Sequence, residues 1–267
     1  MTSGSPQSAP GVPDGRGAVF FDLYGTLIDI RTDEEDPSVY AALAQYLSYF
    51  QVAIGAEALR EEYRKRVRAQ LEWGAGQFPE VDVFEIFRNI LATYGEKQGV
   101  PSLAAGDVPA DVTTLVHTTA ILFRSLTRRH FAVFPDVHPV LTRLQTRYRL
   151  GLISDAQWVF TEPELEMSGL DRFFPVRILS SRIGVRKPDP RIFTAATRAL
   201  GVPTQTAVYI GDNPPRDLVG AHNAGMKCFL FRGGEAEYNG LKPDASFQSY
   251  GDLEAALDRH FNDHASP

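Results

Sequence analysis

The sequence predicts an α/β protein, in which an α-helical cap domain is inserted into a doubly wound, Rossmann-like parallel-sheet core. In the second half of the chain, short apolar segments typical of buried strands alternate with amphipathic segments typical of helices. This alternation indicates a parallel sheet that is covered on both faces. A further strand-like segment near the N-terminus, AVFFDL, is separated from the others by a long helical segment. The 267 residues are enough for both units.

The first half of the chain contains the tail, the first strand and the predicted cap. Residues 1–16 are rich in Gly, Pro and Ser, which predicts a disordered tail. Ala18–Leu23 is expected to be a buried strand because it is short, rich in aromatic and β-branched residues apart from Asp22, and ends at a glycine turn. Helical periodicity prevails from Pro37 to Arg129, with no convincing strand between them. We therefore assign residues 31–130 to the cap, and residues 17–30 and 131–267 to the core.

The remaining elements follow in alternation. A helix introduced by Pro135 and Asp136 precedes the first of them. Strands are expected at RLGLIS (149–154), PVRILSS (175–181), TAVYIGD (206–212) and KCFLF (227–231). The matching helices are expected near residues 162–167, 190–200, 215–224 and 253–261.

Composition limits the partners and the compartment. The chain has 27 basic and 33 acidic residues, a net charge of -6, which argues against a nucleic-acid or membrane-surface partner. Cys228 is the only cysteine, so no internal disulfide is possible. Neither a signal peptide nor an apolar run of about 20 residues is evident, so a cytoplasmic protein is expected. We expect a small-molecule substrate, and the aromatic cap is compatible with a homodimer.

Polar side chains stand where the predicted strands end. Asp22 ends the first strand, Ser154 and Asp155 end RLGLIS, and Asp212 ends TAVYIGD. Lys187 lies in a loop immediately before a predicted helix. Each of these residues alone has an ordinary explanation as a turn, a cap or a surface residue. Because the carboxyl ends of strands in an open parallel sheet meet at one edge, together they predict a binding pocket beneath the inserted cap.

The residue types in this pocket suit phosphoryl transfer. A carboxylate such as Asp22 can attack an electrophilic centre and form a covalent intermediate. The negative charge of a phosphoryl group could be neutralised by Lys187, by the hydroxyl of Ser154 and by backbone amides in the turn at residues 24–26. Asp22 and Asp212 are hard oxygen ligands suited to Mg²⁺, and Asp217 could orient Lys187 or a metal-bound water.

Four motifs in order resemble those of the haloacid dehalogenase-like (HAD) hydrolase superfamily. They are DLYGTL (22–27), LISD (152–155), RKPDP (186–190) and GDNPPRD (211–217). The resemblance extends from Ala18 to about Phe231 and includes a helical cap after the first motif. It implies a hydrolase that uses an aspartate nucleophile.

The resemblance also implies individual roles. Asp22 is the expected nucleophile, Ser154 contacts the transferring group, and Lys187 balances the charge of nucleophile and substrate. Mg²⁺ is expected to bind Asp22, the backbone carbonyl of Tyr24 and Asp212, with Asp217 either a ligand or a residue that orients one. The expected catalytic residues are Asp22, Tyr24, Ser154 and Lys187. The expected substrate-binding residues are Gly25, Thr26, Ser154, Asp155 and Lys187.

Tyr24 departs from the pattern of the family's phosphatases. They carry a general-acid aspartate at this position, and a phenol with a pKa near 10 is a poor substitute near neutral pH. DxYGT resembles the 2-haloacid dehalogenases instead, in which halide leaves without a proton and no Mg²⁺ is needed. Those enzymes have Ser-Asn where this chain has Gly-Asp-Asn, however, so the carboxylate of Asp212 favours a metal and a phosphate substrate.

Three hypotheses follow for the function. The favoured one is a Mg²⁺-dependent phosphatase acting on a small phosphorylated metabolite. The alternatives are a 2-haloacid dehalogenase and a low-activity or non-catalytic descendant that binds a ligand or a protein. Asp155 and Asp29 are candidates to replace the missing acid, and Arg31 is a candidate for a dehalogenase-type cap arginine.

Overall fold

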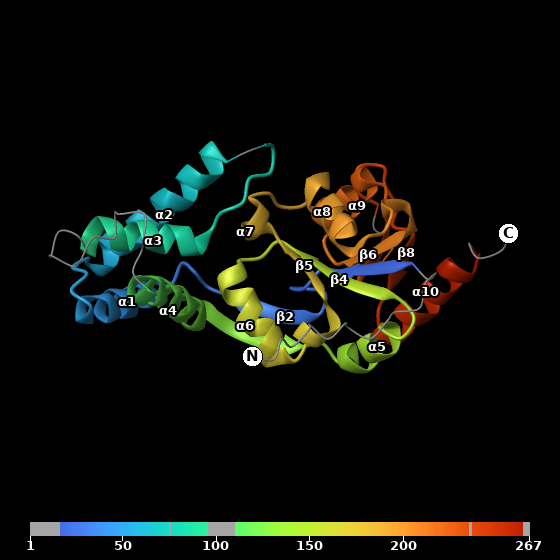
Figure 1. The fold of residues 1–267 in the computed structure, drawn as a ribbon, viewed down its shortest axis with the longest axis horizontal. Coiled ribbons are helices and arrows are strands. Elements are labelled where there is room, and N and C mark those ends of the chain that lie inside the picture. Colours follow the sequence, from blue (N-terminus) through green and yellow to red (C-terminus); the bar gives the residue numbers. More distant parts are fainter. Residues whose placement is uncertain (1–16, 75, 96–109, 235–236, 264–267) are drawn as a thin grey trace, which may run out of the picture.

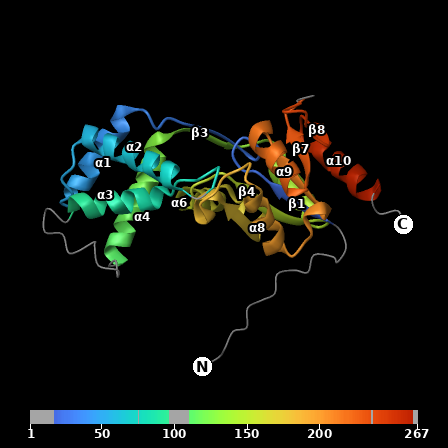
Figure 2. The same ribbon diagram turned by 90° about the horizontal axis from the view of Figure 1, so that it is seen from above.

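The computed structural model describes residues 17–74, 76–95, 110–234 and 237–263. The predicted disordered tail, residues 1–16, lies outside these ranges. Two units lie end to end: a bundle of helices and a sheet flanked by helices (Figure 1). A view turned by 90° separates the same two units (Figure 2).

The core is a single sheet of six parallel strands in the order β5-β4-β1-β6-β7-β8. They are β1 (Ala18–Phe21), β4 (Arg149–Ser154), β5 (Val176–Leu179), β6 (Ala207–Gly211), β7 (Lys227–Phe231) and β8 (Ala245–Phe247). Counted along the chain, this order is 3-2-1-4-5-6, that of a doubly wound sheet whose switch point lies between β1 and β6. The predicted fold class is therefore confirmed, with β8 as a strand that the sequence did not indicate.

Strand β1 is buried on both faces, as its continuous apolar sequence predicts. Val19 and Phe21 belong to one apolar cluster and Ala18 and Phe20 to another, because successive side chains point to opposite faces. The first cluster includes residues of α5 (Val137–Leu144), α6 (Trp158–Ser168) and α10 (Tyr250–Asp263). The second includes residues of α8 (Pro190–Leu200) and α9 (Val219–Ala224).

The helical unit packs around a further apolar cluster, to which Val159 and Phe160 of α6 also contribute. It contains α1 (Pro37–Tyr49), α2 (Ala56–Trp73), α3 (Val83–Gly95) and α4 (Ala110–Thr127), all within the predicted cap. The ring of Tyr63 lies 4.9 Å from that of Phe123 and 5.7 Å from that of Phe87. Aromatic packing of this kind explains why the cap is rich in tyrosine and phenylalanine.

Two strands that the sequence analysis did not predict connect the cap to the core. β2 (Ile28–Thr32) and β3 (Arg128–Val133) form an antiparallel ribbon. The expectation of uninterrupted helix up to Arg129 is therefore wrong at its end, and both predicted cap boundaries fall within this ribbon. The sequence pattern of these two strands is weak because both are half-exposed and carry charged residues. They also pair with each other although the whole cap lies between them in the sequence. In the described part of the chain, no helix is both long and apolar enough to cross a membrane.

Candidate active site

Two carboxylates follow the two strands that flank the switch point. Asp22 comes directly after β1, and its amide donates a 2.8 Å hydrogen bond to the carbonyl of Ile210 in β6. Asp212 comes directly after β6 and accepts a 3.2 Å hydrogen bond from the hydroxyl of Thr26. Gly25 has φ +89°, and a Cβ at this position would lie 2.4 Å from Asp212 Oδ2. The turn after Asp22 therefore requires glycine both for its backbone conformation and for the close approach of Asp212.

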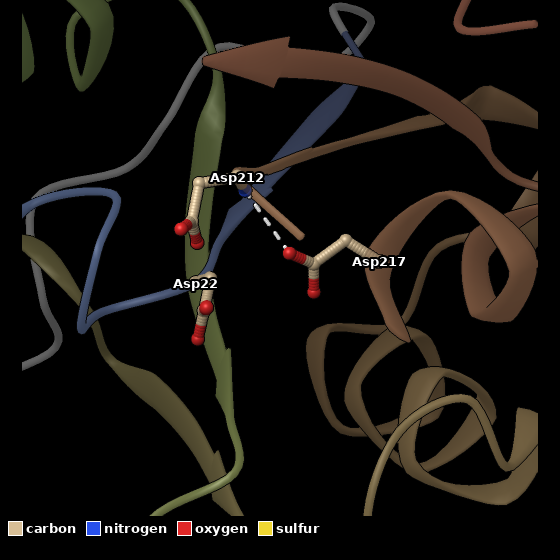
Figure 3. Close-up of side chains that lie close together, drawn as sticks. All are labelled: Asp22, Asp212 and Asp217. Carbon is tan, nitrogen blue, oxygen red and sulfur yellow. Dashed lines mark hydrogen bonds between the residues drawn. The ribbon is translucent and has the colours of Figure 1, made fainter. Parts of the chain in front are cut away.

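A third carboxylate completes an acidic cluster (Figure 3). Asp22, Asp212 and Asp217 each place an oxygen within 4.8 Å of the others. Oδ2 of Asp217 accepts hydrogen bonds from the amides of Asp212 (3.0 Å) and Asn213 (2.8 Å). Asp217 therefore fixes the backbone that carries Asp212.

Lys187 places a buried ammonium within this cluster. Its Nζ lies 3.1 Å from Asp22 Oδ1 and 2.7 Å from Asp217 Oδ1, and it donates a 2.8 Å hydrogen bond to the hydroxyl of Tyr209. Burial disfavours the charged form, but the charges of Asp217 and Asp22 outweigh it and raise the pKa of Lys187 above its ordinary value. Lys187 is therefore a permanent cation beside Asp22.

The cluster holds more negative charge than Lys187 can neutralise. Burial raises the pKa of Asp22 to about 6, with Lys187 opposing the shift and Asp217 adding to it. Burial and the charge of Asp22 likewise raise the pKa of Asp212 to about 6. Three closely spaced carboxylates against one ammonium form a site that a divalent cation with oxygen ligands would fit. Asp22 and Asp212 are the better ligands, because both oxygens of Asp217 already accept hydrogen bonds.

Ser154 and Asp155 lie at the end of β4, the neighbour of β1. Ser154 is buried. Oδ1 of Asp155 accepts a 2.8 Å hydrogen bond from the amide of Lys187 and so joins the second motif to the third. The structure thus brings Asp22, Asp212, Asp217, Lys187 and Asp155 together at one edge of the sheet. Gly25 and Thr26 contact Asp212, and Ser154 immediately precedes Asp155.

The phenol of Tyr24 is held in a network that reaches the cap. Its hydroxyl donates a short hydrogen bond to Glu164 on α6 and lies 3.2 Å from the hydroxyl of Thr161. Glu164 also accepts hydrogen bonds of 2.8 and 2.9 Å from Arg124 on α4, and one of 3.2 Å from Arg128 on β3. Burial, together with the charge of Glu164, raises the pKa of Tyr24 further above its ordinary value. The phenol therefore keeps its proton near neutral pH.

A cavity of about 320 Å³ separates the cap from the core beside Tyr24. Its lining includes Tyr24, Arg124, Asp155, Arg186 and Arg216. In the described part of the chain, the lining includes neither Arg31 nor Asp29; Asp29 lies 3.2 Å from His130 across the ribbon. The sequence analysis missed Arg124 and Glu164, because neither stands in a motif or at a strand end.

The comparison with protein families decides the assignment. The model of the haloacid dehalogenase-like hydrolases matches residues 17–225. The chain belongs to this family. It is therefore a HAD-like hydrolase, as the four motifs indicated.

Individual HAD-like proteins resemble this chain to different extents. The glyceraldehyde 3-phosphate phosphatase of Methanopyrus kandleri is 30% identical over 190 residues, which cover 69% of this chain and 81% of that protein. The phosphoserine phosphatase of Thermus thermophilus is 32% identical over 119 residues, which cover 44% of this chain and 48% of the phosphoserine phosphatase. The crystal structure of a 2-haloacid dehalogenase from Pseudomonas syringae superposes with a TM-score of 0.65 at 25% identity, covering 92% of this chain and all of that one.

Proposed function

We propose that this HAD-like hydrolase is a Mg²⁺-dependent phosphatase that acts on a small phosphorylated metabolite. The observation that carries the proposal is the carboxylate of Asp212, which lies beside Asp22 in a cluster with an excess of negative charge. A haloacid substrate has no need of such a metal site. The phosphatase names of the relatives from Methanopyrus kandleri and Thermus thermophilus agree with this proposal.

Each residue of the site has a role in the proposed reaction. The carboxylate of Asp22 attacks phosphorus and displaces the alcohol, which leaves an aspartyl phosphate that water then hydrolyses. The ammonium of Lys187 neutralises charge on the nucleophile and on the phosphoryl oxygens. Ser154 and the amide of Thr26 are proposed to bind those oxygens, whereas the amide of Gly25 donates its hydrogen bond to the carbonyl of Ile28 (2.8 Å).

The metal would be held by Asp22, Asp212 and the backbone carbonyl of Tyr24. When bound, Mg²⁺ supplies positive charge next to the phosphoryl group. Asp217 keeps its hydrogen bonds to the amides of residues 212 and 213 and so orients Asp212. The substrate is a small molecule, and the cavity between cap and core is the proposed binding site for its leaving group.

Dehalogenation is the second candidate because two observations favour it. Tyr24 matches the dehalogenase form of the first motif, and the structure superposes on a 2-haloacid dehalogenase. The same active site would use Asp22 as nucleophile in both reactions. Asp212 distinguishes the two, since its carboxylate is needed only where a metal is bound.

The deciding experiment measures both products from one preparation. Phosphate release from a panel of phosphorylated metabolites and chloride release from 2-chloropropionate are measured with EDTA and with added Mg²⁺. We expect phosphate release that EDTA abolishes, that Mg²⁺ restores and that Asp22→Asn eliminates. EDTA-resistant chloride release would instead establish the dehalogenase, and absence of both products across the panel would favour a non-catalytic binding protein.

A further inference from the structure

We propose that Asp155 is the general acid and base of this active site and replaces the aspartate that family phosphatases carry at the position of Tyr24. The inference rests on the proposed phosphatase function and adds to it the proton donor, which neither the motifs nor the relatives identify. In this role Asp155 gives a proton to the leaving group, which an alcohol needs and a halide does not.

The fold brings Asp155 to the side of the nucleophile. β4 pairs in parallel with β1, and Phe21 lies opposite Leu152 in the register, so β4 continues past the end of β1 and brings Asp155 next to the turn that follows Asp22. The charge of Asp155 contributes to the raised pKa of Asp22, which places the two carboxylates within electrostatic reach. Asp155 also lines the cavity beside Tyr24, the proposed binding site of the leaving group.

The two oxygens of Asp155 have different environments. Oδ1 accepts a hydrogen bond from the amide of Lys187, which fixes the carboxyl group against the third motif. Oδ2 is buried, and among the described residues it has no hydrogen-bond partner. The nearest cation, Nη1 of Arg216, lies 3.7 Å away, and the side chain of Asp155 is only 8% exposed. A carboxyl oxygen that makes no hydrogen bond, in a side chain that lines a cavity, retains hydrogen-bonding capacity for a bound substrate.

The surroundings make Asp155 easier to protonate than an exposed aspartate. Burial raises its pKa above the ordinary value, and Glu80 adds to the shift. Lys187 and Arg216 oppose the shift without cancelling it. Two other carboxyl groups line this cavity, Glu80 and Glu34. Glu80 accepts hydrogen bonds from the amide of Val81 (2.8 Å) and the hydroxyl of Ser180 (2.7 Å), so both its oxygens are engaged. Burial raises the pKa of Glu34 as well, but its Oε2 accepts a 3.3 Å hydrogen bond from the hydroxyl of Tyr63 in the cap.

The proposed steps balance in protons and bonds. As Asp22 forms its bond to phosphorus, the bond from phosphorus to the ester oxygen breaks, and Oδ2 of Asp155 gives its proton to that oxygen. The alcohol leaves, and Asp155 is then a carboxylate near Arg216. It next takes a proton from the water that attacks the aspartyl phosphate. The bond from phosphorus to Asp22 breaks, inorganic phosphate leaves, and both aspartates return to their starting states.

A series of leaving groups tests the proposal. The values of kcat/KM are measured with Mg²⁺ for phenyl, 4-nitrophenyl and 2,4-dinitrophenyl phosphate, whose leaving groups need protonation progressively less. For Asp155→Asn, which retains the acceptor for the amide of Lys187, we expect a loss of 10²- to 10⁴-fold with phenyl phosphate. With 2,4-dinitrophenyl phosphate we expect a loss of less than about fivefold, since that anion leaves unassisted.

Glu80→Gln is the matched control, because it neutralises a second carboxyl group in the same cavity. We expect it to lower kcat/KM for all three esters to a similar, small extent. Equal losses in Asp155→Asn for all three esters, or no loss, would overturn the inference. A dependence on the leaving group in Tyr24→Phe would overturn it in favour of the phenol.

Further measurements distinguish failure of this inference from failure of the proposed phosphatase function and from loss of folding in the variant. If the parent protein releases no phosphate, or if Asp22→Asn retains the activity, the phosphatase assignment itself fails. Circular dichroism and thermal unfolding compare Asp155→Asn with the parent. If that variant does not fold, Asp155→Ala is assayed with added formate, and the proposal requires formate to restore phenyl phosphate hydrolysis more than 2,4-dinitrophenyl phosphate hydrolysis.

Discussion

The hydroxyl of Tyr24 donates its hydrogen bond to Glu164, the carboxylate that also binds Arg124 and Arg128. Tyr24 lies in the turn after β1, Glu164 on α6, Arg124 at the end of the last cap helix, and Arg128 in the ribbon that returns to the core. One buried carboxylate thus joins the turn after Asp22 to the segment that carries the cap. The tyrosine that departs from the phosphatase motif has a structural explanation here that requires no proton transfer.

We predict that Tyr24→Phe retains phosphatase activity within about fivefold, because its phenol is not the proton donor. Stability should fall by about 1–2 kcal/mol, since buried Glu164 loses one hydrogen-bond donor but keeps both arginines. Phosphate release and urea unfolding of the two proteins measure these effects. A loss of activity above a hundredfold at unchanged stability would contradict the structural role.

Glu164→Ala should be far more destabilising. It leaves the guanidinium of Arg124, whose side chain is 13% exposed, without its bidentate partner. Removing one member of a buried ion pair typically costs about 3–5 kcal/mol. The measurement is urea unfolding, with Glu162→Ala as control, because Glu162 lies on the same helix and pairs with Arg182 at the surface. Equal destabilisation by the two changes would show that the network contributes little.

The parts of the fold that the sequence predicted are those with local signals. β1 is a continuous apolar run, and the helix at residues 190–200 begins with Pro190 after an Asp189 cap that accepts a hydrogen bond from Arg191. The meeting of the candidate site residues was predictable for the same reason. Its residues stand at strand ends, and parallel strands bring their ends together whatever lies between them.

The features that the sequence did not reveal depend on distant partners. β2 and β3 carry charged residues and are partly exposed, and they become strands only by pairing with each other. Glu164 stands in an ordinary helical segment, and its importance comes from Tyr24 and two arginines at distant positions in the chain. No local pattern distinguishes a carboxylate that will be buried in such a network from one that will face water.

Mg²⁺ should stabilise the protein measurably if it binds the acidic cluster. Binding to the folded state alone raises the unfolding free energy by about 2.7 kcal/mol at a metal concentration 100 times Kd. We expect thermal unfolding to shift upward between EDTA and millimolar Mg²⁺, and we expect Asp212→Asn to lose most of the shift. Asp244→Asn is the control, since Asp244 pairs with Lys227 at the N-terminal end of β7, and the acidic cluster lies at the C-terminal ends of the strands. A shift that persists in Asp212→Asn would place the metal elsewhere.

Without metal, the same carboxylates should make the protein less stable as pH rises. The folded-state pKa values of Asp22 and Asp212 are about 6, against an ordinary value of 3.8. The folded state therefore binds these protons more tightly than the unfolded state. Their contribution to stability is fully present below pH 3.8 and is lost as pH rises through about 6. Between about pH 5 and 7.5 the expected loss is of order 1 kcal/mol for each carboxylate.

Urea unfolding in EDTA across that pH range measures this loss. We expect Asp212→Asn to remove about half of the decline, because one of the two raised groups is gone and its charge no longer acts on Asp22. Millimolar Mg²⁺ should flatten or reverse the decline in the parent protein, since the metal favours the ionised carboxylates. An unfolding free energy that increases from pH 5 to 7.5 in EDTA would mean that Asp22 and Asp212 are already ionised and adequately neutralised by Lys187, and would remove the electrostatic reason for a metal at this site.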